Sequence, residues 1–212
     1  GGKGGISVDP SELSERELEQ LCRGYVRGLH KYLGERIDIP APDVGTNGQV
    51  MSWFIDEYAK LNGDNLDLGT FTGKPVGMGG SEGRNEATGF GVAVVVREGA
   101  KRFGIEMADA KIAVQGFGNV GTFTVKNIER QGGKVCAIAE WDKKEGNFAL
   151  YNENGIDFKE LLAYKEANKT IIGFPGATKI SNEEFWTKEY DILVPAALEN
   201  VITEELANKL NV

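Results

Sequence analysis

Cysteine, histidine and long apolar runs are scarce in this chain of 212 residues. Its two cysteines, Cys22 and Cys136, lie in apolar patterns without a Cys-x-x-Cys pair, so neither a disulfide framework nor a metal site is predicted. No apolar run approaches the roughly 20 residues that a membrane-spanning helix requires. No signal peptide is recognisable, so the expected compartment is the cytoplasm.

Basic residues are outnumbered by acidic ones, with 24 Lys and Arg against 32 Asp and Glu, which gives a net charge of -8 at pH 7. Clusters of Lys and Arg, which contacts to a nucleic-acid backbone require, are absent. We therefore expect neither nucleic acid nor a membrane as a partner. The length suffices for one large domain, or for one and a half smaller ones, with a well-buried core.

The first part of the chain shows two helical patterns separated by a proline-containing loop. Ser14-Glu15-Arg16-Glu17 is a capping box, and the amphipathic helix that it begins is expected to end at Gly34. Two prolines within 37–45 exclude a helix there. The spacing of apolar residues predicts a second helix over 48–61.

A third helix is predicted over 86–103, after a glycine-rich connection at 62–83. Its small residues Gly89, Gly91 and Ala93 indicate close packing against a neighbouring element. Arg84, Glu86 and Thr88 stand at its start. They are either ordinary polar residues of a first helical turn or part of a backbone that contacts a ligand.

From Lys111 onward, strands and helices alternate in the rhythm of a parallel sheet. We expect an α/β fold in which 71–212 form the first part of a doubly wound, Rossmann-type nucleotide domain. Residues 1–70 would be the tail of an α/β substrate domain, with a cleft between the two. The strands are expected at 112–115, 135–140, 148–151 and 191–195, and the helices at 157–168 and 203–210.

The segment from Lys111 to Gly121 is a short apolar run that ends in a Gly-x-Gly-x-x-Gly fingerprint and continues into a helical pattern. Gly116 permits a tight strand-to-helix turn, Gly118 lets the backbone approach a pyrophosphate, and Gly121 lets the helix pack closely on the strand. The helix N-terminus presents N–H groups to the phosphates. The segment predicts dinucleotide binding, and an ordinary strand–turn–helix of another doubly wound protein is the alternative.

Glu140 follows the next apolar run, roughly 20 residues after the last glycine, where an acidic side chain meets a ribose 2′-hydroxyl. It favours NAD over NADP, because two like charges about 4 Å apart repel by about 4 kcal/mol at an effective dielectric of ~20, before screening. Asp142 adds negative charge. Lys143 and Lys144 are candidates to offset it, so NADP remains a weaker alternative, as does a merely solvated Glu140.

Lys3 stands between two pairs of glycines, and Asp43 lies in a loop with Pro40 and Pro42. In a closed site, desolvation lowers the pKa of a lysine toward neutrality, where it can transfer protons. A carboxylate held beside it would act as a general acid or base. The alternatives are a flexible tail for Lys3 and an ordinary Asx turn for Asp43.

Five motifs, in this order and spacing, resemble those of the amino-acid dehydrogenases of the glutamate, leucine, phenylalanine and valine superfamily, and together they cover essentially the whole chain. Pro40-Ala41-Pro42-Asp43 and Gly121 are similar to the NAD-linked bacterial glutamate dehydrogenases, whereas leucine and phenylalanine dehydrogenases tend to have Thr-Ala-Glu-Asp and an alanine. The five motifs are Gly1–Gly5, Pro40–Asp43, Thr72–Pro75, Gly79–Gly89 and Gln115–Gly121.

This resemblance implies the reversible, NAD-dependent oxidative deamination of L-glutamate to 2-oxoglutarate and ammonia. Lys3 would bind substrate and assist the attack of water on the iminium, Asp43 would move protons to and from the amino group, and Ala41 would line the substrate pocket. Thr88 and Asn119 would hold the nicotinamide carboxamide, and Arg84 would order the cleft. The complete predicted cofactor-binding set is Arg84, Thr88, Gly116, Phe117, Gly118, Asn119, Val120, Gly121, Glu140, Asp142 and Ala196.

The family also places two lysines before the glycine loop, and a substrate-reading serine and half of the nucleotide domain after the last residue of this chain. We therefore expect an internal segment of an enzyme that is usually hexameric, with little turnover of its own. A dehydrogenase for branched-chain or aromatic amino acids is one alternative, which relative rates with glutamate and leucine would distinguish. A nucleotide-binding module without catalysis is another, which NAD binding without any amino-acid effect would favour.

Overall fold

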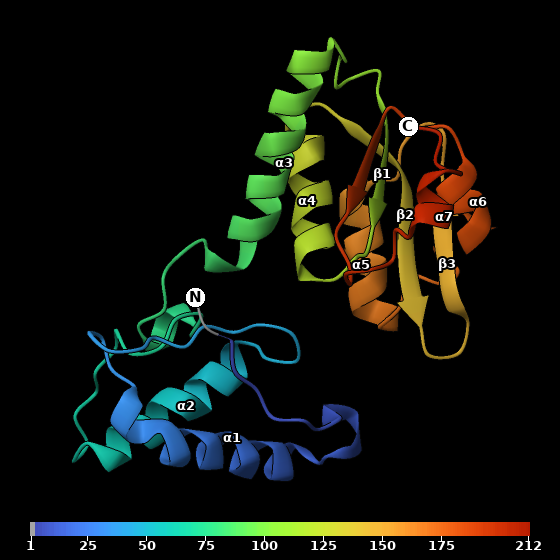
Figure 1. The fold of residues 1–212 in the computed structure, drawn as a ribbon. Coiled ribbons are helices and arrows are strands. Elements are labelled where there is room, and N and C mark those ends of the chain that lie inside the picture. Colours follow the sequence, from blue (N-terminus) through green and yellow to red (C-terminus); the bar gives the residue numbers. More distant parts are fainter. Residues whose placement is uncertain (1–2) are drawn as a thin grey trace. The chain divides into compact units, whose positions relative to one another are not determined.

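The computed structural model describes residues 3–212, and the chain divides into two compact units (Figure 1). One unit ends at Asn85 and the other begins at Glu86. The first two glycines of the predicted N-terminal loop lie outside the described residues. The assignment of 1–70 to a substrate domain and of 71–212 to a nucleotide domain remains a prediction.

The first unit is built on two packed helices, α1 (Glu15–Leu29) and α2 (Gly48–Leu61). The predicted capping box at the start of α1 is confirmed, because the Ser14 hydroxyl accepts from the Glu17 N–H and the Glu17 carboxylate accepts from the Ser14 N–H. The Asn47 side chain caps α2 in a similar way. Three short 3-10 turns complete the unit: η1 (Pro10–Glu12), η2 (His30–Tyr32) and η3 (Val76–Met78).

The core of the first unit lies between these two helices. It includes Val26 of α1, Met51 of α2 and a cluster of aromatic rings. Phe71 comes from the loop after α2 and is fully buried. Its ring packs edge-on against Phe54 and Tyr58, each with centroids 5.6 Å apart. Burial of Phe71 therefore fastens the glycine-rich loop to the helix pair.

The second unit contains a mixed five-stranded sheet in the order β4-β3-β2-β1-β5. Strand β1 pairs in parallel with β2 and β5, while β3 pairs antiparallel with β2 and β4. The strands are β1 (Lys111–Gln115), β2 (Lys134–Asp142), β3 (Gly146–Tyr151), β4 (Thr178–Ser181) and β5 (Ile192–Pro195).

The predicted parallel rhythm is confirmed for β1, β2 and β5 and is wrong for β3. Residues 143–145 alone connect β2 with β3. A parallel crossover needs a dozen or more residues, so this short connection makes a hairpin. Strand β4 adds to the outer side of that hairpin and was not expected from the sequence, because its four residues show little apolar alternation.

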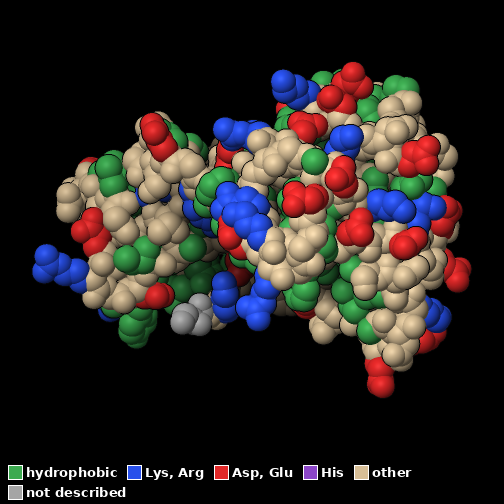
Figure 2. Space-filling view, turned by 90° about the horizontal axis from the view of Figure 1, so that it is seen from above, with side chains coloured by type: hydrophobic (Ala, Val, Ile, Leu, Met, Phe, Trp, Pro, Cys, Tyr) green, Lys and Arg blue, Asp and Glu red, His purple; other side chains and the backbone are tan. Residues whose placement is uncertain are grey.

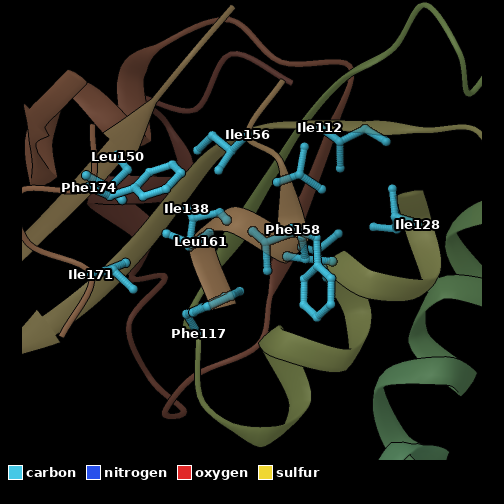
Figure 3. Close-up of a cluster of buried hydrophobic side chains, with 14 of the residues drawn as sticks. Ile112, Phe117, Ile128, Ile138, Leu150, Ile156, Phe158, Leu161, Ile171 and Phe174 are labelled. Carbon is cyan, nitrogen blue, oxygen red and sulfur yellow. The ribbon is translucent and has the colours of Figure 1, made fainter. Parts of the chain in front are cut away.

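Helices cover both faces of the sheet (Figure 1). Successive residues of β1 point to opposite sides: Ile112 and Val114 join the core beneath α3, α4 and α5, whereas Ala113 joins the core beneath α6. Figure 3 shows the first of these cores, with Ile138 of β2 near Leu161 of α5. The helices are α3 (Arg84–Phe103), α4 (Asn119–Arg130), α5 (Phe158–Asn168), α6 (Asn182–Thr187) and α7 (Glu204–Ala207).

The last helix is shorter than the predicted 203–210, although Thr203 caps α7 as expected of a helix start. The backbone beyond it turns into extended pairing: the Tyr190 N–H donates to the carbonyl of Asn211, which also forms a bridge with Glu189. Before this pairing, the N–H groups of Lys209 and Leu210 donate to carbonyls three residues back instead of four, so the α-helical pattern gives way to turns.

Two glycines of α3 have opposite environments, although both were expected to mark close packing. A Cβ on Gly89 would lie 2.5 Å from the Phe123 Cβ of α4, whereas among the described residues nothing lies within 4 Å of a Cβ on Gly91. The prediction is confirmed for Gly89 and for the buried Ala93, and it is wrong for the exposed Gly91.

We predict that Gly89→Ala lowers the free energy of unfolding by about 1–3 kcal/mol, because the added methyl forces α3 away from α4. Gly91→Ala is the matched control and should raise it by about 0.5–1 kcal/mol through helix propensity. Urea denaturation measures both. Equal effects of the two variants would contradict the packing of α3 on α4 at Gly89.

Candidate functional site

Lys3 and Asp43, forty residues apart in sequence, form an ion pair in the first unit, with Lys3 Nζ 2.6 Å from Asp43 Oδ2. The pair is exposed, with side-chain exposures of 82% and 56%. The Lys3 ammonium and the Val44 N–H, which donates to Asp43 Oδ1, hold the pKa of Asp43 below its usual range. Asp43 is therefore ionised at neutral pH.

The backbone around Asp43 is held by Thr46. The Asp43 N–H donates to the Thr46 hydroxyl at 2.6 Å, and that hydroxyl donates to the Asp43 carbonyl at 2.8 Å. The intervening Gly45 has a φ of +77°, in the left-handed region that favours glycine. This tight turn aims the carboxylate at Lys3.

The proline segment before Asp43 is fastened to the Thr72–Pro75 motif. The Thr72 N–H donates to the Pro40 carbonyl at 3.0 Å, and a Cβ on Gly73 would lie 2.4 Å from Pro42 Cγ. Two motifs that are some thirty residues apart in sequence therefore meet in space. Glycine at position 73 is needed both for this approach and for its φ of +70°.

Lys74 of the same motif has a structural role. It is buried, and its ammonium donates to the Leu68 carbonyl at 2.7 Å and to that of Phe71. Burial lowers its pKa. The side chain closes the glycine-rich loop on itself, which the sequence pattern did not reveal.

A cavity of about 460 Å³ in the first unit is lined by Lys3 and Asp43 together with apolar side chains. Ala41, predicted to line a substrate pocket, is among its lining residues. Tyr25 and Leu29 of α1 contribute apolar surface. The cavity thus combines a cation and a carboxylate with an apolar wall, as expected of a site for a small charged organic molecule.

In the second unit, the glycine fingerprint forms the turn between β1 and α4. Gly116 has a φ of +93°, and a Cβ there would lie 2.7 Å from the Ala196 carbonyl after β5. A Cβ on Gly121 would lie 1.8 Å from the Gly116 carbonyl. Gly116 and Gly121 therefore serve backbone packing, and Ala196 lies beside the turn.

Gly118 is different, because among the described residues nothing lies within 4 Å of a Cβ placed on it. Gly118 is the N-cap of α4 and supplies no side-chain cap hydrogen bond there. Asn119 and Val120 begin the helix. There is thus space beside Gly118 at the start of α4, and the binding of an anionic ligand there remains a prediction.

The Glu140 carboxylate lies beside this turn: its Oε2 accepts from the Phe117 N–H at 3.1 Å. The Phe117 ring is fully buried in the core and anchors the turn (Figure 3). The Glu140 side chain is 25% exposed. Glu140 therefore lies next to the fingerprint, and its contact with a ribose remains a prediction.

Lys165 of α5 is a residue of this region that the sequence reasoning missed. Its Nζ lies 3.5 Å from Glu140 Oε2 and 2.5 Å from the Phe117 carbonyl. No local signal could have revealed it, because it comes from a helix 25 residues beyond Glu140. Lys143 and Lys144, the cations expected near Glu140, instead stand exposed in the β2–β3 turn.

Three predicted cofactor-binding positions remain: Asp142, Arg84 and Thr88. Asp142 Oδ1 accepts from the Lys144 N–H at 2.7 Å and shapes the β2–β3 turn, and this bond is the main cause of its lowered pKa. Arg84 and Thr88 lie in the first two turns of α3, on either side of the division between the units. Their roles toward a cofactor remain predictions.

Within residues 3–212 no group of three or more His, Cys, Asp or Glu side chains is placed to hold a metal ion. None of the helices in this range has the length and apolar character to cross a bilayer. Cys22 and Cys136 are both buried free thiols. Acidic and basic side chains are interspersed over the visible face of the second unit (Figure 2).

The sheet, its helices and the glycine turn define an α/β protein of the doubly wound class. Residues 79–212 match the family model of glutamate/leucine/phenylalanine/valine dehydrogenases, and residues 1–60 match the dimerisation domain of the same enzymes. The chain belongs to this dehydrogenase family.

Two curated relatives are NAD-specific glutamate dehydrogenases. That of Peptoniphilus asaccharolyticus is 84% identical over 100% of this chain and 50% of the relative, and that of Clostridioides difficile is 59% identical over 99% and 50%. The chain thus spans about half the length of these relatives. The solved hetero-hexameric glutamate dehydrogenase of Thermus thermophilus is 36% identical, with a TM-score of 0.85, over 96% of this chain and 47% of the solved one.

We predict that Lys3→Gln raises the pKa of Asp43 toward the ordinary carboxylate value, because it removes the main cause of the lowering. The pKa should stay somewhat below that value, because the Val44 N–H still donates to the Asp43 carboxylate. Carbon-detected NMR titration of the Asp43 carboxyl measures the pKa. Lys60→Gln is the control, since Lys60 pairs with Asp56 instead. An Asp43 pKa that is equal in all three proteins would contradict the ion pair.

Proposed function

We propose that this chain supplies the cofactor turn and the lysine–aspartate pair of an NAD-dependent glutamate dehydrogenase. The reaction is the reversible oxidative deamination of L-glutamate to 2-oxoglutarate and ammonia. The observation that carries the proposal is the Lys3–Asp43 ion pair in the wall of the cavity of the first unit. The names of the two curated relatives support glutamate, and not leucine or phenylalanine, as substrate.

The second unit fits a dinucleotide. The open backbone at Gly118 and the start of α4 would receive the pyrophosphate, and Glu140 would accept a hydrogen bond from the ribose 2′-hydroxyl. The conformation of the turn is fixed by the packing of Gly116, Phe117, Gly121 and Ala196. When bound, NAD⁺ supplies a hydride acceptor. Glu140 supports NAD, with NADP as a weaker alternative, and the relatives named NAD-specific agree.

In the first unit, Asp43 is held as a carboxylate and is therefore able to take a proton from the substrate's amino group. Lys3 provides the positive charge that orients the substrate carboxylate and stabilises the negative charge that develops on oxygen when water adds to the carbon. The small side chain of Ala41 leaves room for the substrate in the cavity. On the family resemblance, Thr88 and Asn119 are assigned to the nicotinamide carboxamide and Arg84 to ordering the cleft. Asp142 and Val120 are assigned to neighbouring cofactor contacts.

The native assembly that we propose is a homo-oligomer, with the hexamer as the leading form. The support is indirect: the related Thermus enzyme is hetero-hexameric, and residues 1–60 match a dimerisation domain. The proposed activity is that of a polypeptide as long as the curated relatives, of which this chain would form about half.

We predict that Asp43→Asn lowers kcat for glutamate oxidation about 10²-fold or more, because an amide cannot take the proton. The measurement is glutamate-dependent NADH formation by a polypeptide of the relatives' length that contains this chain. Asp64→Asn, in an exposed loop of the same unit, is the matched control and should leave kcat unchanged. Undiminished turnover by Asp43→Asn would contradict the assigned role.

We predict that Glu140→Gln shifts the preference toward NADP by about tenfold, because the repulsion of a 2′-phosphate is removed. Calorimetric titration with NAD⁺ and NADP⁺ gives the ratio of dissociation constants. Glu153→Gln, which changes an exposed carboxylate of the loop after β3, should leave that ratio as it is. An unchanged ratio in Glu140→Gln would remove Glu140 from cofactor selection.

A further inference from the structure

The ammonium of Lys165 occupies a central position beside the glycine turn. It donates to the Phe117 carbonyl at 2.5 Å, lies 3.5 Å from Glu140 Oε2, and stands 5.0 Å from the centroid of the Phe117 ring. The side chains of Lys165 and Glu140 are only 31% and 25% exposed, so water screens their charges less than it screens those of a surface pair.

One oxygen atom is shared in this arrangement. Glu140 Oε2 receives the Phe117 N–H at 3.1 Å and also faces the Lys165 ammonium. The carboxylate that is expected to contact the ribose 2′-position is therefore paired with a cation from α5. The charge that a ligand meets there is that of the pair, and not that of an isolated carboxylate.

We propose that Lys165 is a specificity-determining residue that sets how strongly this site discriminates NAD from NADP, an inference that rests on the proposed function. The ammonium offsets the negative charge of Glu140 and attracts a 2′-phosphate, so it permits residual use of NADP. Without Lys165, the carboxylate repels the 2′-phosphate with its full charge.

The test is Lys165→Gln in calorimetric titrations with NAD⁺ and NADP⁺. The ratio of the NADP⁺ to the NAD⁺ dissociation constant should rise about fivefold, the effect expected of one partly exposed ion pair. The ratio is the decisive quantity, because loss of the bond to the Phe117 carbonyl would loosen the turn and weaken both nucleotides alike. A purely structural role therefore leaves the ratio unchanged.

Two further variants sharpen the test. Lys165→Arg keeps the charge and should keep the ratio near that of the unsubstituted protein. Lys159→Gln removes an exposed lysine from the same helix and should leave both dissociation constants unchanged. A ratio within twofold of the original in Lys165→Gln, or a ratio that falls, would overturn the inference.

The outcomes separate this inference from the proposed function. If the unsubstituted protein binds NAD⁺ while Lys165→Gln leaves the ratio unchanged, the inference alone fails. If the unsubstituted protein binds neither NAD⁺ nor NADP⁺, the proposed function fails and the inference fails with it. Adenosine 2′-monophosphate and adenosine 5′-monophosphate serve as further probes, and only the first should lose affinity in Lys165→Gln relative to the second.

Discussion

The close approach of backbone to backbone at Gly116 is the constraint on which the second unit depends. A side chain at this position would meet the Ala196 carbonyl, and the carbonyl of Gly116 itself leaves no room for one at Gly121. The turn can therefore pass between β2 and β5 and deliver the start of α4 next to Glu140. Burial of the Phe117 ring then holds the turn in place, because moving it would open the core (Figure 3).

In the first unit, the residues of the candidate site lie on loops, which are held in place without regular secondary structure. The loops that carry Asp43 and Lys74 have few helical or strand hydrogen bonds, and they are instead held by Thr46, by the packing of Pro42 on Gly73, and by the burial of Phe71. A functional carboxylate on a loop needs such support, since a loop alone would leave its position undetermined. The cavity beside it is enclosed by apolar side chains of α1 and α2 together with the N-terminal segment and the loop 38–46.

Features governed by local sequence were predictable, whereas long-range contacts were not. The capping box at Ser14, the bounds of α2 and the glycine turn follow from neighbouring residues, and all three are confirmed. The antiparallel pairing of β2 with β3 was not predicted. The alternation of strand and helix patterns favoured a parallel sheet, although the short connection between the two strands allows only a hairpin. Lys165 was missed because only tertiary folding brings α5 to Glu140. The Lys3–Asp43 contact was expected only through the family resemblance, and its catalytic role remains a proposal.

We propose above all that the glycine turn binds a dinucleotide while Glu140 contacts its ribose. Amide NMR spectra recorded during an NAD⁺ titration test it most directly. We expect the largest shift changes at Gly118 and Asn119, smaller ones at Phe117 and Trp141, and none at Gly132, which follows the opposite end of α4. Saturating NAD⁺ that leaves the Gly118 and Asn119 signals in place would contradict it.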